Sequence, residues 1–349
     1  IETFDRWRLE RKSMALVTVY DTLGSTYTKA GHRIVVAADG SYCGLISGGC
    51  LEGDIAEHAI RVLESRSAKP LTYDLRDEVD DVFGLGVGCN GLIRVFIQPL
   101  LPESDYAPFA ALRELYDGLR PALSATVIES AAAEIPPGAT CVIREDGACN
   151  ALSDDAGTSE LAQLLSAQWS QDAKPGATAL YTEIAGHGIL FAPLSPIPRL
   201  LILGAGLDAV PLVRMAVELG WYVDIADHRP AYLERKDLAA ADSARLVDPR
   251  NPRDITHGRQ RYDAAVVMSH HLETDAAYLR ALAALKLRYL GVLGPPARRV
   301  KLLEQLEPEF PDLRRQLHGP IGLDIGSAGP EAIALSILAE LQSVFSGRA

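Results

Sequence analysis

The stretch RLLILGAGLDA at residues 199–209 decides the fold of the C-terminal half of this chain. A short apolar run ends in Gly204 and Gly206, and an apolar-periodic helix follows, with Ala209 where a third glycine is common. A strand, a glycine turn and a helix in this order direct backbone N–H groups toward a phosphate. About twenty residues later a second predicted strand ends in Asp227, a residue type that meets a ribose hydroxyl. The sequence therefore predicts a dinucleotide-type fold.

The length of 349 residues favours two domains. Predicted strands and helices alternate over 199–349, which indicates a Rossmann-like, doubly wound parallel sheet. Residues 1–193 are predicted to form an N-terminal α+β domain. The segment PLSPIP at 193–198 is the best linker, because proline blocks both helix continuation and strand pairing. The expected class is α/β.

Composition excludes several kinds of protein. A hydrophobic fraction of 48% and a charged fraction of 23% are typical of a globular protein. The net charge of −12 argues against nucleic acid or an anionic membrane as the main partner. No apolar stretch approaches the ~20 residues of a membrane span, and the N-terminus does not resemble a signal peptide. Five cysteines without a CxxC pair favour reduced thiols in the cytoplasm, with Cys43, Cys141 and Cys149 as structural or surface thiols.

The segment ISGGCLEGD at 46–54 carries the sharpest chemical signal. It puts Cys50 at the start of a predicted helix, where the dipole favours a thiolate, so this residue could be a soft ligand or handle sulfur. The backbone N–H groups of Gly48 and Gly49 could bind an anion there. Glu52 falls in the first helical turn. The alternative is a tight turn around a buried, inert cysteine.

Two further N-terminal segments are rich in glycine. FGLGVGCNG at 83–91 precedes a predicted strand, and its glycines suit close approach of backbone to a ligand. Gly88 and Cys89 could face Cys50 across one pocket, or the segment could be a flexible connection. GSTYTKAG at 24–31 offers hydroxyls and Lys29, which suit a phosphate.

Histidines follow directly on a predicted strand in the second domain. Since the carboxyl ends of parallel strands face the ligand crevice, His270 or His271 is expected to overlook it, but not both. A neutral imidazole there suits proton transfer or phosphate contact. No Glu or His lies at metal-ligand spacing from them, so a zinc site is not expected.

Two later loops complete the candidate crevice. In GVLGPPARR at 291–299, Arg298 follows Gly294 in the first turn of a predicted helix. A cation is unfavourable at that end unless an anion lies beside it, which favours a phosphate contact. In PIGLDIG at 320–326, Asp324 is the single acid.

Together these segments resemble the XdhC/CoxI family, accessory proteins of molybdenum hydroxylases such as xanthine and carbon monoxide dehydrogenases. The likeness rests on GS and KAG in 24–31, SGGCLE at 47–52, GVGCNG at 86–91, LGAG at 203–206, SH at 269–270, LGVLG at 290–294, and GPIGLDIG at 319–326 with PE at 330–331. Some relatives have two glycines where this chain has Asn90-Gly91, and residues 121–193 carry no recognisable motif.

The resemblance implies a chaperone that binds molybdenum cofactor (molybdopterin), supports its sulfuration and inserts it into an apo molybdenum hydroxylase. Cys50 and Glu52 are the expected catalytic residues, with Cys50 as a soft ligand to molybdenum. The expected cofactor-binding residues are Lys29, Gly48, Gly49, Cys50, Gly88, Cys89, Gly204, Gly206, Asp227, His270, Gly294, Arg298 and Asp324. Expected partners are the apo-hydroxylase, a cysteine desulfurase and a second copy of the chain.

Two alternatives remain open. Gly204, Gly206 and Asp227 would also suit an NAD(P)-dependent oxidoreductase, with NAD favoured by Asp227 unless the nearby Arg229 reverses that preference. A sulfurtransferase with a persulfide on Cys50 is the second. A carrier without turnover of its own is favoured, because the sequence offers no convincing acid–base pair.

Overall fold

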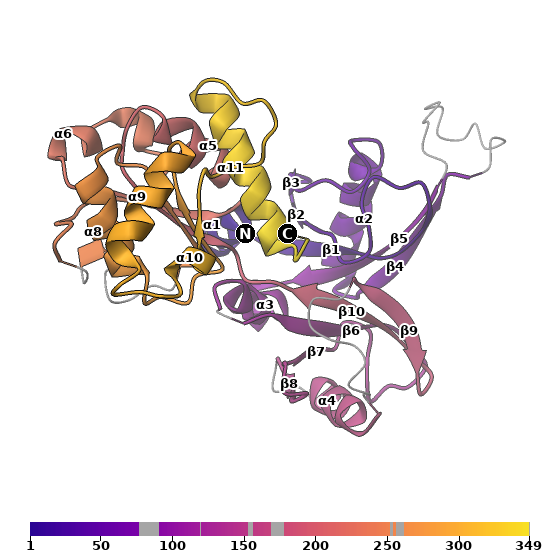
Figure 1. Cartoon of the computed structure of the whole chain (residues 1–349). Helices are drawn as coiled ribbons and strands as arrows, with labels where there is room; N and C mark the ends of the chain where they lie inside the picture. The colour runs from indigo at the N-terminus through magenta and orange to yellow at the C-terminus, as the bar shows by residue number, and fades with distance from the viewer. Residues whose placement is uncertain are drawn as a thin grey trace. The chain divides into compact units, whose positions relative to one another are not determined.

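The structure, a computed structural model, describes residues 1–76, 91–118, 120–152, 156–168, 178–251, 254–255 and 262–348. The chain divides into two compact units, Ile1–Pro196 and Ile197–Ala349, whose elements are labelled in Figure 1. None of the helices within the described ranges combines the length and the apolar character needed to cross a bilayer.

The first unit contains two five-stranded antiparallel sheets. One has the order β3-β2-β1-β5-β4, with β1 (Met14–Gly24), β2 (Arg33–Ala37), β3 (Tyr42–Cys43), β4 (Lys69–Asp74) and β5 (Gly91–Leu100). The other has the order β8-β7-β6-β10-β9, with β6 (Ala122–Ser130), β7 (Thr140–Ile143), β8 (Cys149–Ala151), β9 (Leu180–Ile184) and β10 (His187–Leu194). The helices are α1 (Glu2–Leu9), α2 (Glu52–Ser65), the 3-10 turn η2 (Pro102–Ser104), α3 (Phe109–Tyr116) and α4 (Ala156–Gln168).

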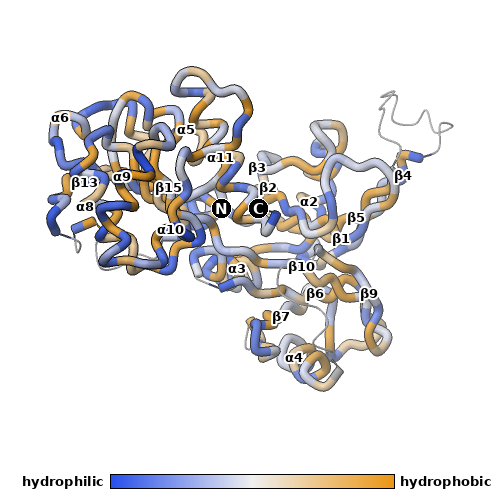
Figure 2. Tube along the Cα trace, viewed as in Figure 1, coloured by the Kyte–Doolittle hydropathy of each residue, from blue (hydrophilic) through white to orange (hydrophobic). Residues whose placement is uncertain are grey.

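Each sheet of the first unit buries one face under a helix. α2 places Ile55, Ala59 and Val62 on the first sheet, at the i, i+4, i+7 spacing of an amphipathic helix. α4 covers the second sheet with Leu161 and Leu165. Hydrophobic residues accordingly follow the strands in Figure 2. Both sheets also contribute to an apolar cluster around α1 and α3, so they share a core.

The second unit is a six-stranded parallel sheet with the order β13-β12-β11-β14-β15-β16. Its strands are β11 (Arg199–Leu203), β12 (Tyr222–Asp227), β13 (Ser243–Leu246), β14 (Ala264–Val267), β15 (Tyr289–Val292) and β16 (Leu317–His318). Its helices are α5 (Ala209–Glu218), α6 (Pro230–Leu233), η3 (Lys236–Leu238), α8 (Leu272–Leu282), α9 (Pro296–Leu306), α10 (Leu313–Gln316) and α11 (Pro330–Phe345). Numbered from β11, the order is the 3-2-1-4-5-6 of the Rossmann fold. The predicted α/β class is confirmed.

Alternate residues of β11 point to opposite faces of this sheet. Leu200 and Ile202 pack with residues of α5 and α11, whereas Leu201 and Leu203 pack with residues of α8 and α9. The helix pairs can be followed on the second unit in Figure 1. The strand order reverses between β11 and β14, which is where ligands bind in open α/β sheets.

In the first unit, β5 begins in close contact with the 24–31 loop. Gly24 pairs with Gly91 at the end of the β1–β5 ladder. A Cβ on Gly91 would overlap the carbonyl oxygen of Ser25 and the methyl group of Thr26. Only glycine allows this approach, because the obstructing Ser25 atom belongs to the backbone.

We expect Gly91→Ala to destabilise the first unit by about 1–3 kcal/mol, the usual cost of overpacking. Gly53→Ala is the matched control, because Gly53 lies in α2 with nothing within 4 Å of an added Cβ, and there alanine should stabilise by about 0.5–1 kcal/mol. Thermal unfolding followed by calorimetry measures both. Equal effects of the two substitutions would contradict the close contact.

Candidate functional site

Three segments that are distant in sequence meet at a small pocket in the first unit. It is lined by Ser25, Thr26, Tyr27, Ser47, Cys50, Leu75, Gly91 and Ile93. The 24–31 loop, the SGGC turn and the start of β5 thus lie around one hollow. Cys50 is exposed there as a free thiol, two residues before the first residue of α2. The alternative in which this cysteine is buried is therefore wrong.

The SGGC turn is held by the carboxylate of Glu52, whose side chain is fully buried. Its Oε1 accepts hydrogen bonds from the backbone N–H groups of Ile46 and Ser47, both at 2.8 Å. Its Oε2 accepts from the Ser47 hydroxyl at 2.5 Å and from the N–H of Gly49 at 3.0 Å. Burial raises the pKa of Glu52, but these donors lower it by more, so the net pKa lies below its ordinary value.

This geometry corrects two expectations about the turn. The sequence predicts a catalytic Glu52, but a buried carboxylate with four internal donors positions the loop instead. The sequence also predicts that Gly49 helps bind an external anion, but its N–H meets the Glu52 carboxylate. Gly48 and Gly49 have φ values of +83° and +111°, which glycine adopts most readily. The glycines therefore shape the turn that presents Cys50.

The 24–31 loop is tied to this turn and carries exposed polar and aromatic groups. The buried Thr28 hydroxyl donates to the carbonyl of Ile46 at 2.9 Å. Lys29 is exposed, and its Nζ donates to Oγ1 of the pocket residue Thr26 at 3.2 Å. Tyr27 is 64% exposed, and its ring lies over Gly48. The pocket thus combines a thiol, hydroxyls, an aromatic face and a nearby cation.

The predicted residues Gly88 and Cys89 lie outside the described residues. Gly91 closes that glycine-rich segment and lines the pocket.

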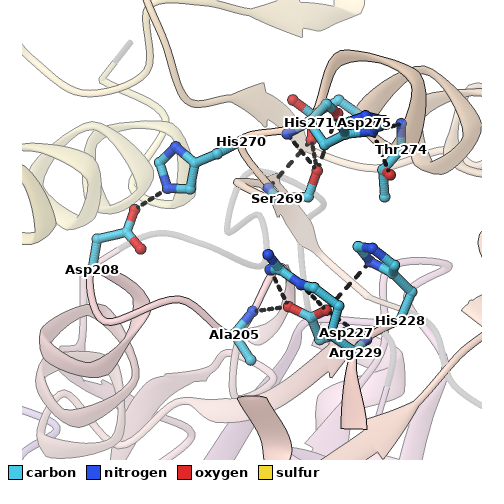
Figure 3. Close-up of polar contacts among 10 residues, drawn as sticks. All are labelled: Ala205, Asp208, Asp227, His228, Arg229, Ser269, His270, His271, Thr274 and Asp275. Atoms are coloured by element: carbon cyan, nitrogen blue, oxygen red, sulfur yellow. Dashed lines mark hydrogen bonds and ion pairs between the residues drawn. The ribbon is translucent and has the colours of Figure 1, made fainter. Parts of the chain in front are cut away.

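In the second unit, His270 lies at the switch point between β11 and β14 (Figure 3). Its side chain is 59% exposed, and its Nε2 lies 2.7 Å from Oδ2 of Asp208 at the start of α5. Its φ of +62° is uncommon for a residue other than glycine. His271 instead caps α8 through Thr274, so the two histidines have different roles and only His270 meets Asp208.

Close contacts explain the glycines of the turn after β11. An added Cβ on Gly204 would lie 2.5 Å from the carbonyl oxygen of Met268. One on Gly206 would overlap Asp208.

Asp227 at the end of β12 points into the protein. Its side chain has no exposed area. The carboxylate accepts hydrogen bonds from the backbone N–H of Ala205 at 2.7 Å and from the backbone N–H and guanidinium of Arg229 at 2.8–2.9 Å. Burial raises the pKa of Asp227, but these donors outweigh it, so the net pKa is lowered. In this conformation the carboxylate cannot make the expected contact with a ribose, because Ala205 and Arg229 enclose it (Figure 3).

Arg298 also meets an internal carboxylate. Its Nε and Nη2 donate to Oδ2 of Asp275 at 2.8 and 2.5 Å, and the Asp275 side chain has no exposed area. The other oxygen of Asp275 accepts from the hydroxyl and N–H of Ser269. Gly294 has a φ of +138°, and a Cβ there would lie 2.5 Å from Cδ of Arg298. The anion beside Arg298 is thus Asp275, which replaces the expected phosphate in this role.

Asp324 is exposed in the loop that follows β16, between Leu323 (44% exposed) and Ile325 (51% exposed). The loop is anchored by Glu340 of α11, which accepts from the N–H of Gly322 at 2.6 Å and the hydroxyl of Tyr289 at 2.7 Å. Asp324 remains a candidate contact at the carboxyl edge of the sheet.

Sequence reasoning missed the residues that hold these loops. Asp275 and Glu340 lie inside helices, and Thr28 looks like an ordinary loop residue. Tyr27 lies two residues before Lys29 in the motif, but only its exposure and its contact with Gly48 indicate a role. A cation near a helix N-terminus indicates a neighbouring anion, but the sequence does not show that this anion is an internal acid such as Asp275.

We expect Glu52→Gln to lower the stability of the first unit by about 2 kcal/mol at neutral pH, because it removes a charged acceptor of four hydrogen bonds. Since the pKa of Glu52 in the folded protein lies below its ordinary 4.5, the carboxylate stabilises fully above pH 4.5. That contribution disappears as the pH falls through the folded-state pKa. The gap between wild type and variant should therefore narrow below pH 4.5 in calorimetric melts. Glu57→Gln, at an exposed position of α2, should track wild type. Parallel curves for wild type and Glu52→Gln would contradict this role.

Removing Arg298 should leave Asp275 as an unpaired buried charge. We expect Arg298→Ala to destabilise the second unit by about 3 kcal/mol. Lys301→Ala removes an equal charge from an exposed position of the same helix and should change the melting temperature little. If the two variants melt alike, the Arg298–Asp275 pair has no structural role.

Comparison with known proteins agrees with this architecture. A family model described as the XdhC Rossmann domain matches residues 200–341, and one described as the XdhC and CoxI family matches residues 7–74. The chain is 29% identical to a Bacillus subtilis protein named as a probable xanthine dehydrogenase subunit, over 95% of this chain and 93% of that protein. It is 24% identical to "Molybdenum cofactor insertion chaperone PaoD" of Escherichia coli, over 95% of this chain and 84% of that protein.

A solved structure is similar over the full length. The crystal structure of a xanthine dehydrogenase from Bacillus halodurans matches with a TM-score of 0.76 and 26% identity, covering 100% of this chain and 96% of that one. Two models of one family thus match both units, in the same order as the motifs. The chain belongs to the XdhC/CoxI family.

Proposed function

We propose that this chain is a molybdenum cofactor insertion chaperone for a hydroxylase of the xanthine dehydrogenase type. It binds molybdopterin, supports its sulfuration and passes it to the apo-hydroxylase. The observation that carries the proposal is the exposed thiol of Cys50 in a pocket formed by the SGGC turn, the 24–31 loop and Gly91. The name of the PaoD relative supports the same cargo.

The groups around Cys50 match the chemistry of this cargo. A thiolate is a soft donor, which suits molybdenum and its sulfur ligands. Molybdopterin also carries a flat heterocycle and a phosphate. The exposed ring of Tyr27 offers a face on which a flat ring can stack. Lys29 and the hydroxyls of Ser25 and Thr26 offer partners for phosphate oxygens.

The environment of the acids near the thiol favours a role in binding rather than in catalysis. General acid–base catalysis needs a titratable group within hydrogen-bond reach of the reacting atoms. Glu52 is enclosed by its own loop, and Asp54 accepts from the hydroxyl of Tyr73 at 2.6 Å. Both acids close to Cys50 in sequence are therefore engaged in structural hydrogen bonds.

The remaining partners follow from the same role. A cysteine desulfurase would supply the sulfur for sulfuration, and a second copy of the chain is the proposed homodimer partner.

NAD(P) binding has less support, because the Asp227 carboxylate is already enclosed by Arg229 and Ala205. Calorimetric titration of the full-length protein with NAD and with NADP should therefore give no binding heat.

We expect purified protein titrated with molybdenum cofactor to retain it after gel filtration, read out as pterin fluorescence after iodine oxidation. Cys50→Ala should lose most of the retained pterin, because the soft donor is removed. Cys43→Ala is the matched control, since Cys43 is also an exposed free thiol of the first unit, and it should retain the cofactor as wild type does.

The same variants test delivery. Apo-hydroxylase incubated with loaded wild-type protein should gain activity, and with Cys50→Ala it should gain much less. Full retention and delivery by Cys50→Ala would remove the thiol from the mechanism. No retention by wild type would overturn the cargo itself.

A further inference from the structure

The second sheet of the first unit contains a pair of thiols in contact. Sγ of Cys149 lies 3.0 Å from Sγ of Cys141, and both cysteines are free. Cys141 belongs to β7 and Cys149 to β8, neighbouring antiparallel strands at one edge of the sheet. Cys149 pairs with Ile143 and Cys141 with Ala151, so the cysteines are diagonal neighbours whose side chains meet across the ladder. The region 121–193, which carries no recognisable sequence motif, thus contains two cysteines whose thiols are in contact.

The two thiols differ in access and environment. Cys141 is fully buried in the apolar cluster under α4, whereas Cys149 is partly exposed at its rim. The hydrogen bond between the two sulfurs raises the pKa of Cys141, as does burial. The same hydrogen bond lowers the pKa of Cys149, because a proton held on Cys141 stabilises the Cys149 thiolate. Cys149 is therefore the thiol that a reagent from solution can reach, and Cys141 is placed to attack it from within.

We propose that Cys141 and Cys149 form a redox-active dithiol that small disulfides oxidise to an intramolecular disulfide. The Cys149 thiolate attacks a disulfide R–S–S–R, forms a mixed disulfide and releases one RS⁻. The Cys141 thiol then attacks Sγ of Cys149 and passes its proton to the departing sulfur, so the second half of the small disulfide leaves as RSH. The protein dithiol loses two electrons and two protons, and the small disulfide gains the two electrons.

The closing step requires β8 to move toward β7, because diagonal neighbours lie about 7–8 Å apart, at the upper limit of the Cα separation in a disulfide. A disulfide needs a sulfur separation of about 2.05 Å, so the two atoms must approach by about 1 Å from their present 3.0 Å. β8 has three residues, lies at the sheet edge and pairs only with β7 among the described strands. Such a strand can shift without breaking a second ladder. In a reducing compartment the couple would rest as the dithiol and close only transiently.

The test uses the full-length protein equilibrated with mixtures of reduced and oxidised glutathione. After an acid quench and denaturation, free thiols are labelled with a maleimide and located by peptide mass mapping. As the oxidised fraction rises, the peptides with Cys141 and Cys149 should lose their labels together and appear as one cross-linked pair lacking two hydrogens. The exposed Cys43 and Cys50 should show only mixed disulfides with glutathione.

Single variants separate the two roles. With Cys141→Ser, Cys149 should accumulate as a mixed disulfide, because the resolving thiol is gone. With Cys149→Ser, Cys141 should stay labelled in every mixture, because it is buried. The proposal is overturned if wild-type Cys141 keeps its label where Cys50 is fully oxidised, or if wild-type Cys149 stops at the mixed disulfide. No cofactor is needed, so failure here is distinct from failure of the proposed chaperone function.

Discussion

Buried carboxylates hold the loops from which both candidate sites are built. Glu52 holds the SGGC turn, Asp227 holds the turn after β11, and Asp275 joins the loop after β14 to Arg298. Glu340 anchors the loop after β16. A buried charge is tolerated only when it is paired and hydrogen-bonded. Each carboxylate therefore needs its loop to keep the observed backbone path, and each loop needs its carboxylate.

This constraint explains where sequence reasoning succeeds. The strand expected within 199–209 is β11, and the strand expected directly before the two histidines is β14. Their apolar periodicity is set by burial on a sheet face, which is visible in the sequence. The carboxyl edge of the parallel sheet follows from the alternation of strands and helices. The two-sheet arrangement of the first unit does not, because antiparallel strands give no comparable rule for their order.

The same constraint explains where sequence reasoning stops. An acid at the end of β12 can turn outward to a ribose or inward to its own glycine turn. Here Arg229, two residues later, donates to Asp227 and favours the inward orientation. Likewise a cation near a helix N-terminus indicates an anion, but Asp275 comes from another helix, and only tertiary structure brings it to Arg298. The contact between Cys141 and Cys149 depends on the register of β7 and β8, which their spacing alone does not fix.

Inward-facing acids also bear on how a chain with a net charge of −12 could hold an anionic cargo. Charges separated by more than about 8 Å are largely screened at physiological ionic strength, so the groups that line the pocket matter most. Around Cys50 those groups are hydroxyls, an aromatic ring and backbone, with Lys29 on the adjoining loop. Glu52 keeps its negative charge inside the turn, so favourable contacts with an arriving phosphate have to come from Lys29 and the hydroxyls. Burying an acid under the loop thus shapes the turn that presents Cys50, while binding of the anionic part of the proposed cargo depends on the adjoining 24–31 loop.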